Sequence, residues 1–323
     1  MSHSNSLSNT FIRLYQLHHS AKQPVKQTSN AFFEKEKVFL SLFGLGLFET
    51  YDFLYQKCQD ADDFKNWIKA LKGEDFFLNA EKQFNLLDKN RDPEPYRPGI
   101  LSDEQQLIWK KQGYLQIENL IDAADCDAVV DLICDTLAID LKNEETWYHQ
   151  HEKLQGLMLQ LYQDEAIVRI RNNSLVKDVF MDLYRNKQIL PNCEKVSYNP
   201  PINAHFSFKG SPLHWDFDVA KGPQYYIQGL VYLNDVPSDR GAFTVIPAFH
   251  HQIEEFRSAF ETTEAALQAL RGKGLEKPVP GKKGDLIVWL EALPHAASPN
   301  HSCLPRFVQY INFSPVFRMT EQW

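Results

Sequence analysis

The sequence lacks the features that mark several broad classes of protein. Its five cysteines, Cys58, Cys126, Cys134, Cys193 and Cys303, are odd in number and form no CxxC pair. That pattern argues against a disulfide framework and against a zinc site built from cysteines, and it favours a reducing compartment. Lys and Arg number 34 against 42 Asp and Glu, which gives a net charge of −8. Without a basic surplus, neither nucleic acid nor an anionic membrane is an expected partner.

Long apolar runs are also missing. The first 20 residues, MSHSNSLSNTFIRLYQLHHS, have no basic segment followed by an apolar one, so no secretory signal is expected. The longest apolar run nearby, VFLSLFGLGLF at residues 38–48, is too short to span a bilayer. Hydrophobic residues nevertheless make up 43% of the chain and aromatic residues 13%, which is ample for a folded core. The default prediction is a cytoplasmic protein without a membrane span.

The residue pattern divides the chain into a helical part and a strand-rich part. Residues 1–30 are polar and predict a frayed arm or a loose first helix. Over residues 31–90 apolar residues recur at helical spacing, which predicts helices. Within this range, DADDFKNWIKALKG begins with Asp caps and ends on Gly73. The segment DKNRDPEPYRPGI at residues 88–100 has three prolines and is the best linker candidate. We therefore predict a helical N-terminal extension over residues 1–95 and one domain over residues 96–323.

Within residues 96–323, helices are expected to come before strands. LSDEQQLIWKKQGYLQIENLI predicts a helix with a Ser102–Gln105 capping box that ends at Gly113, followed by a strand. DAADCDAVVDLICDTLAI predicts a second helix, and residues 145–190 are expected to be mostly helical. Strand-like runs then follow, separated by turn residues: EKVSYNPP, AHFSFKG, YYIQGLVYLND, GAFTVIP, GDLIVWL and RFVQYINFSPV. This spacing predicts an α+β fold with a helical N-terminal half packed around a double-sheet jelly-roll core.

The stretch SPLHWDFDVA places His214 and Asp216 on either side of Trp215. If the stretch is a strand, both side chains point to one face and offer two metal ligands. Two histidines and one carboxylate on one octahedral face are the pattern of non-haem Fe(II) oxygenases. His295 follows an apolar run, and Arg306 comes eleven residues later at the start of RFVQYINF. Taken alone, the HxD pair is more often a coincidence and Arg306 an ordinary partner in a surface ion pair.

Three segments taken together resemble a known family: HWDFD, GLVYLNDVPSDRGAFTVIPAFHH and GDLIVWLEALPHAASPN…PRFVQYINF. They closely resemble the phytanoyl-CoA dioxygenase family of Fe(II)- and 2-oxoglutarate-dependent oxygenases. The resemblance is strongest over residues 190–318, extends more weakly to the helix and strand that begin at residue 101, and does not reach residues 1–95.

The resemblance implies a double-stranded β-helix, cupin-like core and a dioxygenase that uses Fe(II), 2-oxoglutarate and O2. It implies hydroxylation of an unactivated C–H bond of a small organic molecule, with release of succinate and CO2. It further implies that His214, Asp216 and His295 bind iron and that Arg306 binds the distal carboxylate of 2-oxoglutarate.

One position departs from the family pattern. Many members carry a small hydroxyl residue two positions after the distal histidine, and here that position is Ala297, followed by Ser298. Either Ser298 takes over the contact with the co-substrate carboxylate or the contact is lost. Lys195, Ser197 and Asn199 alternate on the strand before the predicted ligands, where members often place a polar residue near the keto acid. Lys195 and Asn199 are therefore cofactor candidates, against the alternative of a solvated strand face.

Other residues carry weaker expectations. Gln228 interrupts an apolar run, so a role beside the cofactor competes with simple burial of a paired amide. Trp215 either packs in the core or contacts substrate. Arg169 and Arg171 are candidates to meet an anionic substrate, although a plain basic face is the simpler interpretation. His250, in PAFHH, is expected to make a structural hydrogen bond rather than to bind metal.

Two other functions fit the same residues in part. A cupin-like zinc or manganese enzyme, such as an isomerase or hydrolase, would use the three ligands but would not need the dicarboxylate clamp that Arg306 suggests. A non-catalytic binding protein on a decayed oxygenase fold predicts a missing ligand, and all three are present. The sequence does not determine the substrate, the oligomeric state, or the choice among hydroxylation, desaturation and ring chemistry.

Overall fold

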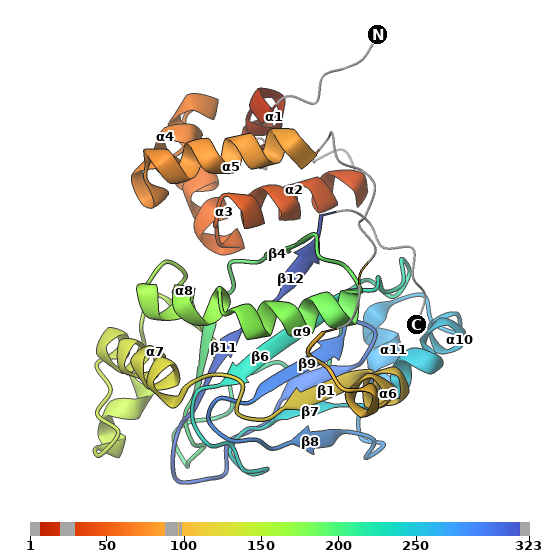
Figure 1. Ribbon diagram of the computed structural model, residues 1–323. Coiled ribbons are helices and arrows are strands. Elements are labelled where there is room, and N and C mark those ends of the chain that lie inside the picture. The colour runs from red at the N-terminus through yellow and green to blue at the C-terminus, as the bar shows by residue number, and fades with distance from the viewer. Residues whose placement is uncertain (1–6, 20–29, 88–95, 97–98, 317–323) are drawn as a thin grey trace. The chain divides into compact units, whose positions relative to one another are not determined.

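The computed structural model describes residues 7–19, 30–87, 96 and 99–316 (Figure 1). The chain divides into two compact units. The first takes its described residues from Met1–Tyr96, Asn186–Glu194 and Phe313–Arg318, and the second from Arg97–Arg185 and Lys195–Asn312. The predicted domain boundary at residue 95 and most of the predicted linker lie outside the described residues, so that boundary stays a prediction.

The first unit has its own aromatic core. Phe11, Phe39, Phe43, Phe64 and Phe77 are buried and contact one another ring to ring, with centroids 4.6 to 6.1 Å apart. Such rings bury large apolar areas and favour edge-to-face or offset contacts. The elements of this unit are α1 (Leu7–His19), α2 (Asn30–Leu42), α3 (Leu47–Gln56), α4 (Ala61–Lys72), α5 (Glu74–Leu87) and the paired strands β4 (Ile189–Pro191) and β12 (Phe313–Pro315).

Helix ends predicted from capping residues are confirmed. The Asp60 side chain accepts hydrogen bonds from two backbone N–H groups at the start of α4, which ends before Gly73. In the second unit, the hydroxyl of Ser102 accepts from the Gln105 backbone N–H, and the Gln105 side chain accepts from the Ser102 backbone N–H. Gly113 ends that helix with φ of 73°, a conformation that favours glycine.

The second unit combines helices with two larger sheets. Its helical elements are α6 (Asp103–Gln112), α7 (Ala123–Leu137), the 3₁₀ helix η1 (Glu144–Tyr148), α8 (Glu165–Arg171), α9 (Ser174–Tyr184), the 3₁₀ helix η2 (Phe249–His251), α10 (Ile253–Arg257) and α11 (Thr263–Gln268). Its strands are β1 (Tyr114–Ile117), β2 (Leu154–Gln155), β3 (Met158–Leu159), β5 (Val196–Asn199), β6 (Ile227–Tyr232), β7 (Phe243–Val245), β8 (Lys277–Val279), β9 (Leu286–Leu290), β10 (His295–Ala297) and β11 (Arg306–Tyr310).

Two expectations for segments of this unit outside the predicted metal ligands are wrong. AHFSFKG forms no strand, because residues 203–206 turn back on themselves: the Asn203 side chain accepts from the backbone N–H groups of His205 and Phe206. Residues 145–190 are also less helical than expected, since the β2–β3 hairpin interrupts them. The other strand-like runs do form strands.

The register of the larger sheet fixes which side chains share a face. The sheet has seven strands in the order β1-β9-β6-β11-β5-β3-β2. Directly opposed residues of antiparallel strands point to the same face. Gln228 is opposed to Trp289, and Arg306 is opposed to Asn199. Val308, on the same face as Arg306, is opposed to Tyr232 on one side and to Ser197 on the other. Tyr232 in turn shares its face with Gln228, and Ser197 shares its face with Asn199. All of these side chains therefore lie on one face, called here the inner face.

Helices cover the opposite face of this sheet (Figure 1). A side chain at Gly229 of β6 would meet the ring of Phe180 in α9, and Gln309 of β11 donates to the carbonyl of Ile167 in α8. Gly229 and Gln309 alternate with the inner-face residues, so α8 and α9 pack on the outer face.

The inner face packs on a second sheet of three strands, in the order β10-β7-β8. The ring of Phe243 in β7 lies 4.3 Å from that of Trp289. The Tyr232 hydroxyl donates to the carbonyl of Val279 in β8 and accepts from the Phe243 backbone N–H. Two antiparallel sheets thus face each other, and the predicted α+β jelly-roll core is confirmed.

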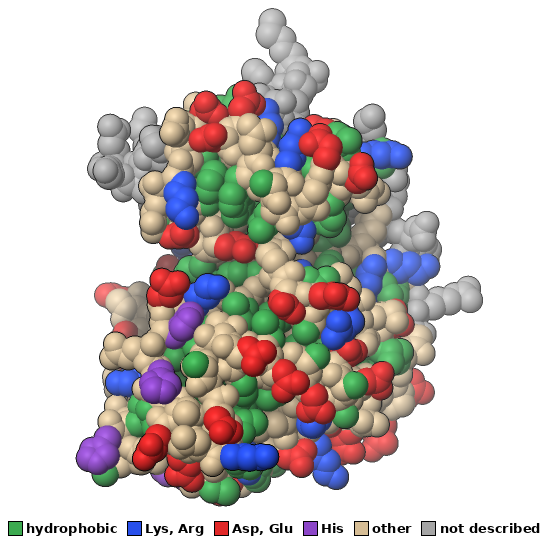
Figure 2. All heavy atoms as spheres, turned by 90° about the vertical axis from the view of Figure 1, so that its left-hand side faces the viewer, with side chains coloured by type: hydrophobic (Ala, Val, Ile, Leu, Met, Phe, Trp, Pro, Cys, Tyr) green, Lys and Arg blue, Asp and Glu red, His purple; other side chains and the backbone are tan. Residues whose placement is uncertain are grey.

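The face of the molecule shown in Figure 2 carries Asp and Glu side chains across most of its area, with Lys and Arg scattered among them. No broad basic surface is visible on that face. Among the described residues, no helix combines the length and apolar character needed to cross a bilayer.

Candidate functional site

The three side chains predicted as metal ligands lie together. The ligand atoms of His214, Asp216 and His295 are all within 4.8 Å of one another. Asp216 Oδ1 is 3.7 Å from His214 Nε2, and Asp216 Oδ2 is 3.5 Å from His295 Nε2. The side chain of His295 is 7% exposed, whereas those of His214 and Asp216 are 31% and 47% exposed. This cluster, called here the metal triad, is therefore closed at His295 and open at Asp216.

The backbone brings the triad together differently from the predicted strand. His214 and His295 form a single antiparallel bridge, in which each backbone N–H donates to the other's carbonyl at 2.9 and 3.0 Å. The chain then bends at Asp216, so the expected strand through HWD is wrong. Trp215 explains the departure: its indole N–H donates to the carbonyl of Ala292, and its ring packs against Phe249. Burial of this indole anchors the stretch from the side opposite the ligands.

Each histidine is oriented through its second ring nitrogen. His214 Nδ1 lies 2.8 Å from the carbonyl oxygen of Pro212, and His295 Nδ1 lies 3.1 Å from that of Leu293. A carbonyl oxygen can only accept, so Nδ1 carries the proton and donates in both rings. Both Nε2 lone pairs are then directed toward the cluster, in the tautomer that metal-binding histidines require.

Asp216 is held by a chain of two hydrogen bonds from the inner face. Gln228 Nε2 donates to Asp216 Oδ2 at 2.5 Å, and Trp289 Nε1 donates to Gln228 Oε1 at 3.0 Å. Because the indole can only donate, the Gln228 amide must present its oxygen to Trp289 and its nitrogen to Asp216. Gln228 thus lies beside a predicted metal ligand, and its role with a cofactor stays a prediction.

The electrostatics of the triad favour the forms that bind a metal. Burial lowers the pKa of the His214 imidazole, and the neighbouring His295 lowers it further, so His214 is neutral near pH 7. Burial acts to raise the pKa of the Asp216 carboxyl, but contacts with His295 and the amide of Gln228 outweigh it and hold the pKa well below its usual range. A neutral imidazole and an ionised carboxylate are the ligand states.

Arg306 lies at the start of β11 and is almost completely buried. Its Nη1 donates to the carbonyl of Gly241 at 2.7 Å and its Nη2 to the hydroxyl of Ser197 at 3.1 Å, while Nε has no partner. No carboxylate among residues 7–19, 30–87, 96 and 99–316 forms an ion pair with it. A buried guanidinium without a counter-charge is costly, so this position suits an anionic ligand.

Asn199 lies directly opposite Arg306 and is also fully buried. Its amide nitrogen donates to the carbonyl of Ser298, and its Oδ1 has no partner. Gly241 packs against this amide, because a Cβ there would lie 2.3 Å from Asn199 Nδ2. We call Arg306, Ser197, Asn199 and Gly241 the arginine cluster.

The Ser298 carbonyl contacts this cluster through Asn199, but the Ser298 hydroxyl has a different partner. Ser298 Oγ lies 2.6 Å from the hydroxyl of Thr244, and its bond is with that side chain rather than with Arg306. Thr244 lies opposite Ala296 in the pairing of β7 with β10. It is next to Phe243, whose ring packs on Trp289, so the Thr244 side chain points to the other face of its sheet. Sequence reasoning therefore missed Ser197 as the hydroxyl beside Arg306, although its alternation with Asn199 along β5 was the available signal.

The structure gives the remaining predicted site residues other contacts. Lys195 precedes β5 and is half-buried, and its carbonyl accepts from the Tyr310 backbone N–H. Trp215 is packed in the core as described. Arg169 is exposed on α8 and pairs with Asp125, whereas Arg171 is buried and donates to the carbonyl of Tyr162. Two positions apart on a helix they do not share a face, so the structure does not bring these two arginines together.

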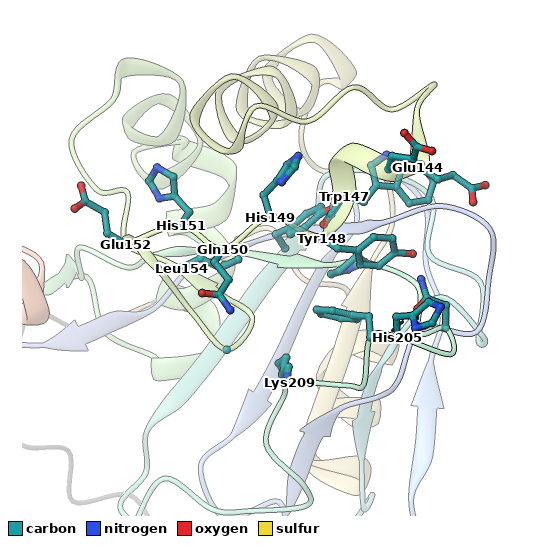
Figure 3. A pocket seen from close by; sticks show the side chains of 16 residues that line it. Glu144, Trp147, Tyr148, His149, Gln150, His151, Glu152, Leu154, His205 and Lys209 are labelled. Atoms are coloured by element: carbon teal, nitrogen blue, oxygen red, sulfur yellow. Dashed lines mark hydrogen bonds between the residues drawn. The ribbon is translucent and has the colours of Figure 1, made fainter.

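A separate cavity of about 920 Å³ lies beside β5 (Figure 3). Its lining residues come from within 144–156 and 198–209 and include Tyr148, His149 and His205, but no residue of the triad or of the arginine cluster. Tyr198, which contributes to the lining, alternates with Ser197 and Asn199 and so points away from the inner face. The cavity is therefore on the other side of β5 from the arginine cluster.

The family model for phytanoyl-CoA dioxygenase matches residues 109–308, well over half of the chain. The chain belongs to the phytanoyl-CoA dioxygenase family. The resemblance inferred from its motifs is thereby confirmed, and the protein is an Fe(II)- and 2-oxoglutarate-dependent oxygenase. Iron, 2-oxoglutarate and O2 are the cofactor and co-substrates that this class uses. The matched region lies wholly within residues 96–323.

Individual relatives are distant. A Dictyostelium discoideum protein described as a candidate phytanoyl-CoA dioxygenase is 21% identical over 266 residues, covering 64% of this chain and 74% of the relative. The structure of EctD from S. alaskensis with bound Fe is 19% identical, with a TM-score of 0.52, and the match covers 71% of this chain and 82% of EctD. SnoK, an alpha ketoglutarate dependent carbocyclase from nogalamycin biosynthesis, is 15% identical, with a TM-score of 0.51 and coverage of 68% and 86%. At such identities the two structures support the fold alone.

Proposed function

We propose that this protein hydroxylates an unactivated C–H bond of a small organic molecule and releases succinate and CO2 from 2-oxoglutarate. One observation carries the proposal. The metal triad converges beside Gln228, and Gln228 shares the inner face with Arg306, a buried cation that has no carboxylate partner among the described residues. A metal site and an anion site on one face suit a co-substrate that has a chelating end and a charged end.

The residues present fit both groups. His214 and His295 would hold iron through Nε2, and Asp216 through a carboxylate oxygen, which is the ligand set of this oxygenase class. When bound together, Fe(II), 2-oxoglutarate and O2 supply the oxidation of the C–H bond. The protein supplies the orientation: Pro212 and Leu293 carbonyls fix the two rings, and the amide of Gln228 fixes the carboxylate.

Arg306 would bind the distal carboxylate of 2-oxoglutarate. Its unpartnered Nε and its burial make a charge-assisted hydrogen bond at this position strong, because little water competes for it. The other side of the metal triad is open at Asp216, and that opening is where a substrate would approach.

The presence of Asp216 favours hydroxylation over halogenation, since the carboxylate takes the metal position that a halide would need. The substrate class is a small organic molecule. SnoK, which is similar in fold, is a carbocyclase, so ring closure and desaturation are the alternative outcomes that product analysis must separate.

The test is succinate release from 2-oxoglutarate by the purified chain with Fe(II), ascorbate and O2, in the absence of substrate. We expect slow turnover that is lost in Arg306→Ala. Arg169→Ala is the matched control, because Arg169 is an exposed arginine on α8 outside the site, and it should keep wild-type turnover. If wild type and Arg306→Ala release succinate equally, the assignment of Arg306 is wrong. If iron does not bind while zinc or manganese does, the oxygenation chemistry itself is contradicted.

A further inference from the structure

Ser197 is the hydroxyl that the structure places beside Arg306. It lies on β5, fully buried, and is opposed to Val308 on the inner face. Within the described residues its hydroxyl oxygen has one hydrogen bond, in which it accepts from Arg306 Nη2. A hydroxyl carries one proton to donate in addition to its acceptor lone pairs. The Ser197 O–H is therefore a donor without an acceptor, next to a cation that has no anion.

Two further buried atoms at this position lack partners. Among the residues that the structure describes, Arg306 Nε is a donor without an acceptor, and Asn199 Oδ1 is an acceptor without a donor. Buried polar groups are paired in the great majority of native structures, so a group of unpaired atoms in one place indicates a ligand or ordered water. The donors here, the Ser197 O–H and the Arg306 Nε–H, match the acceptor oxygens of a carboxylate.

The hydroxyl that many family members carry two positions after the distal histidine is absent in this chain. Position 297 is alanine, and Ser298 is bonded to Thr244. Gly241 brings the backbone close to Asn199 and offers its carbonyl to Arg306, so the guanidinium is fixed between Gly241 and Ser197. A carboxylate entering from the inner face would then find two donors that have no other acceptor among the described residues.

We propose that Ser197 binds the distal carboxylate of 2-oxoglutarate together with Arg306, and that it supplies the hydroxyl contact that position 297 lacks. This inference rests on the proposed function, since it names a residue of the same co-substrate site. It gives Ser197 a role in selecting a 2-oxo acid with a second carboxylate over one without.

The experiment is an anaerobic titration of the Fe(II)-loaded protein with 2-oxoglutarate, followed by the charge-transfer absorption of the metal–keto acid complex. We expect Ser197→Ala to raise the dissociation constant for 2-oxoglutarate about tenfold, the usual effect of losing a hydrogen bond to a charged group. Ser298→Ala is the matched control and should stay within about twofold of wild type, because only its side-chain bond to Thr244 is lost.

Pyruvate separates a direct contact from a structural effect. It has the chelating keto acid and no distal carboxylate, so Ser197→Ala should leave its dissociation constant unchanged. Ser197→Cys preserves the shape of the side chain with a weaker donor, so it should lower the affinity for 2-oxoglutarate less than Ser197→Ala does. It replaces the alanine variant in the titration if that variant does not fold. Equal weakening of pyruvate and 2-oxoglutarate, or no change for 2-oxoglutarate, would overturn the inference.

The titration also distinguishes this inference from the proposed function. A charge-transfer band in wild type with normal affinity in Ser197→Ala contradicts the role of Ser197 alone. Absence of the band in wild type, with iron shown to be bound, contradicts the co-substrate assignment and the role of Ser197 with it.

Discussion

The metal triad and the arginine cluster lie in the same sandwich of two sheets but are built in opposite ways. The triad has partly exposed ligands, with Asp216 47% exposed, and each histidine is oriented by a carbonyl two residues earlier in the chain. The arginine cluster is sealed and is assembled from β5, β11 and the turn before β7, segments more than 40 residues apart. The triad is open to solvent on the side of Asp216, whereas the arginine cluster is buried and presents a cation to whatever enters it.

The largest effect is expected from removing a triad ligand. His295→Ala deletes the most buried ligand, and iron affinity should fall by more than about 100-fold, beyond the 10–100-fold typical for outer partners of metal ligands. Equilibrium dialysis with Fe(II) measures it. His301→Ala, a change at an exposed histidine six residues later, is the control. Retention of iron by His295→Ala would show that the triad is not the metal site.

The next largest effect is expected from breaking the hydrogen-bond chain from Trp289 through Gln228 to Asp216, which connects the metal triad to the inner face. Gln228→Leu removes the donor to Asp216 and leaves the Trp289 N–H without an acceptor. We expect iron affinity to fall about 10–100-fold. Gln309→Leu is matched in chemistry and burial but faces α8, so it should lower thermal stability and leave iron affinity unchanged. Equal iron affinity in the two variants would rule out an orienting role for Gln228.

His250 belongs to neither the metal triad nor the arginine cluster, and it is expected to make the stability of the fold depend on pH. His250 is buried beneath Gly113, and its Nε2 lies 3.0 Å from the carbonyl of Lys110, as expected for a structural hydrogen bond. Burial lowers its pKa to about 4, so the folded protein holds it neutral, while the unfolded chain takes up a proton below pH 6.5. Stability from this group is complete above pH 6.5 and is lost as the pH falls toward 4.

The loss over that pH window should reach about 2–3 kcal/mol in the free energy of unfolding. Urea denaturation of the metal-free protein at several pH values measures it. His250→Gln should show a smaller decline between pH 6.5 and 4 than wild type. The same decline in both proteins would mean that other groups, such as carboxylates, cause all of the acid sensitivity.

The smallest effect tests the close packing of the arginine cluster. Gly241 and Gly272 both have positive φ, at 62° and 77°, but a Cβ at Gly241 meets Asn199 and the Ser298 carbonyl, whereas one at Gly272 meets nothing within 4 Å. Both Gly→Ala variants share the backbone penalty, and Gly241→Ala should cost about 1–2 kcal/mol more because it overpacks the site. Thermal or urea unfolding of the pair measures the difference. Equal stability of the two variants would show that Asn199 moves aside freely.

The comparison also explains what could be predicted from the sequence. The resemblance of several motifs to the phytanoyl-CoA dioxygenase family predicted the triad and Arg306, and their binding roles stay predictions. Capping residues placed the ends of α4 and α6, because a cap depends on neighbours in the chain. The strand expected through HWD was wrong, because the pattern does not show that the Trp215 indole is bonded to Ala292 and holds the chain out of the sheet. Ser298 stays a sequence-based prediction for the contact with the co-substrate. The sequence alone could not show that Ser197 lies beside the guanidinium, because that depends on the register of β5 against β11.

The most direct test of the account is a crystal structure of the protein grown without oxygen in the presence of Fe(II) and 2-oxoglutarate. We predict iron bound by His214 Nε2, His295 Nε2 and an Asp216 oxygen, with the distal carboxylate on Arg306 and Ser197. Iron bound elsewhere, or 2-oxoglutarate whose distal carboxylate lies away from Arg306, would contradict it.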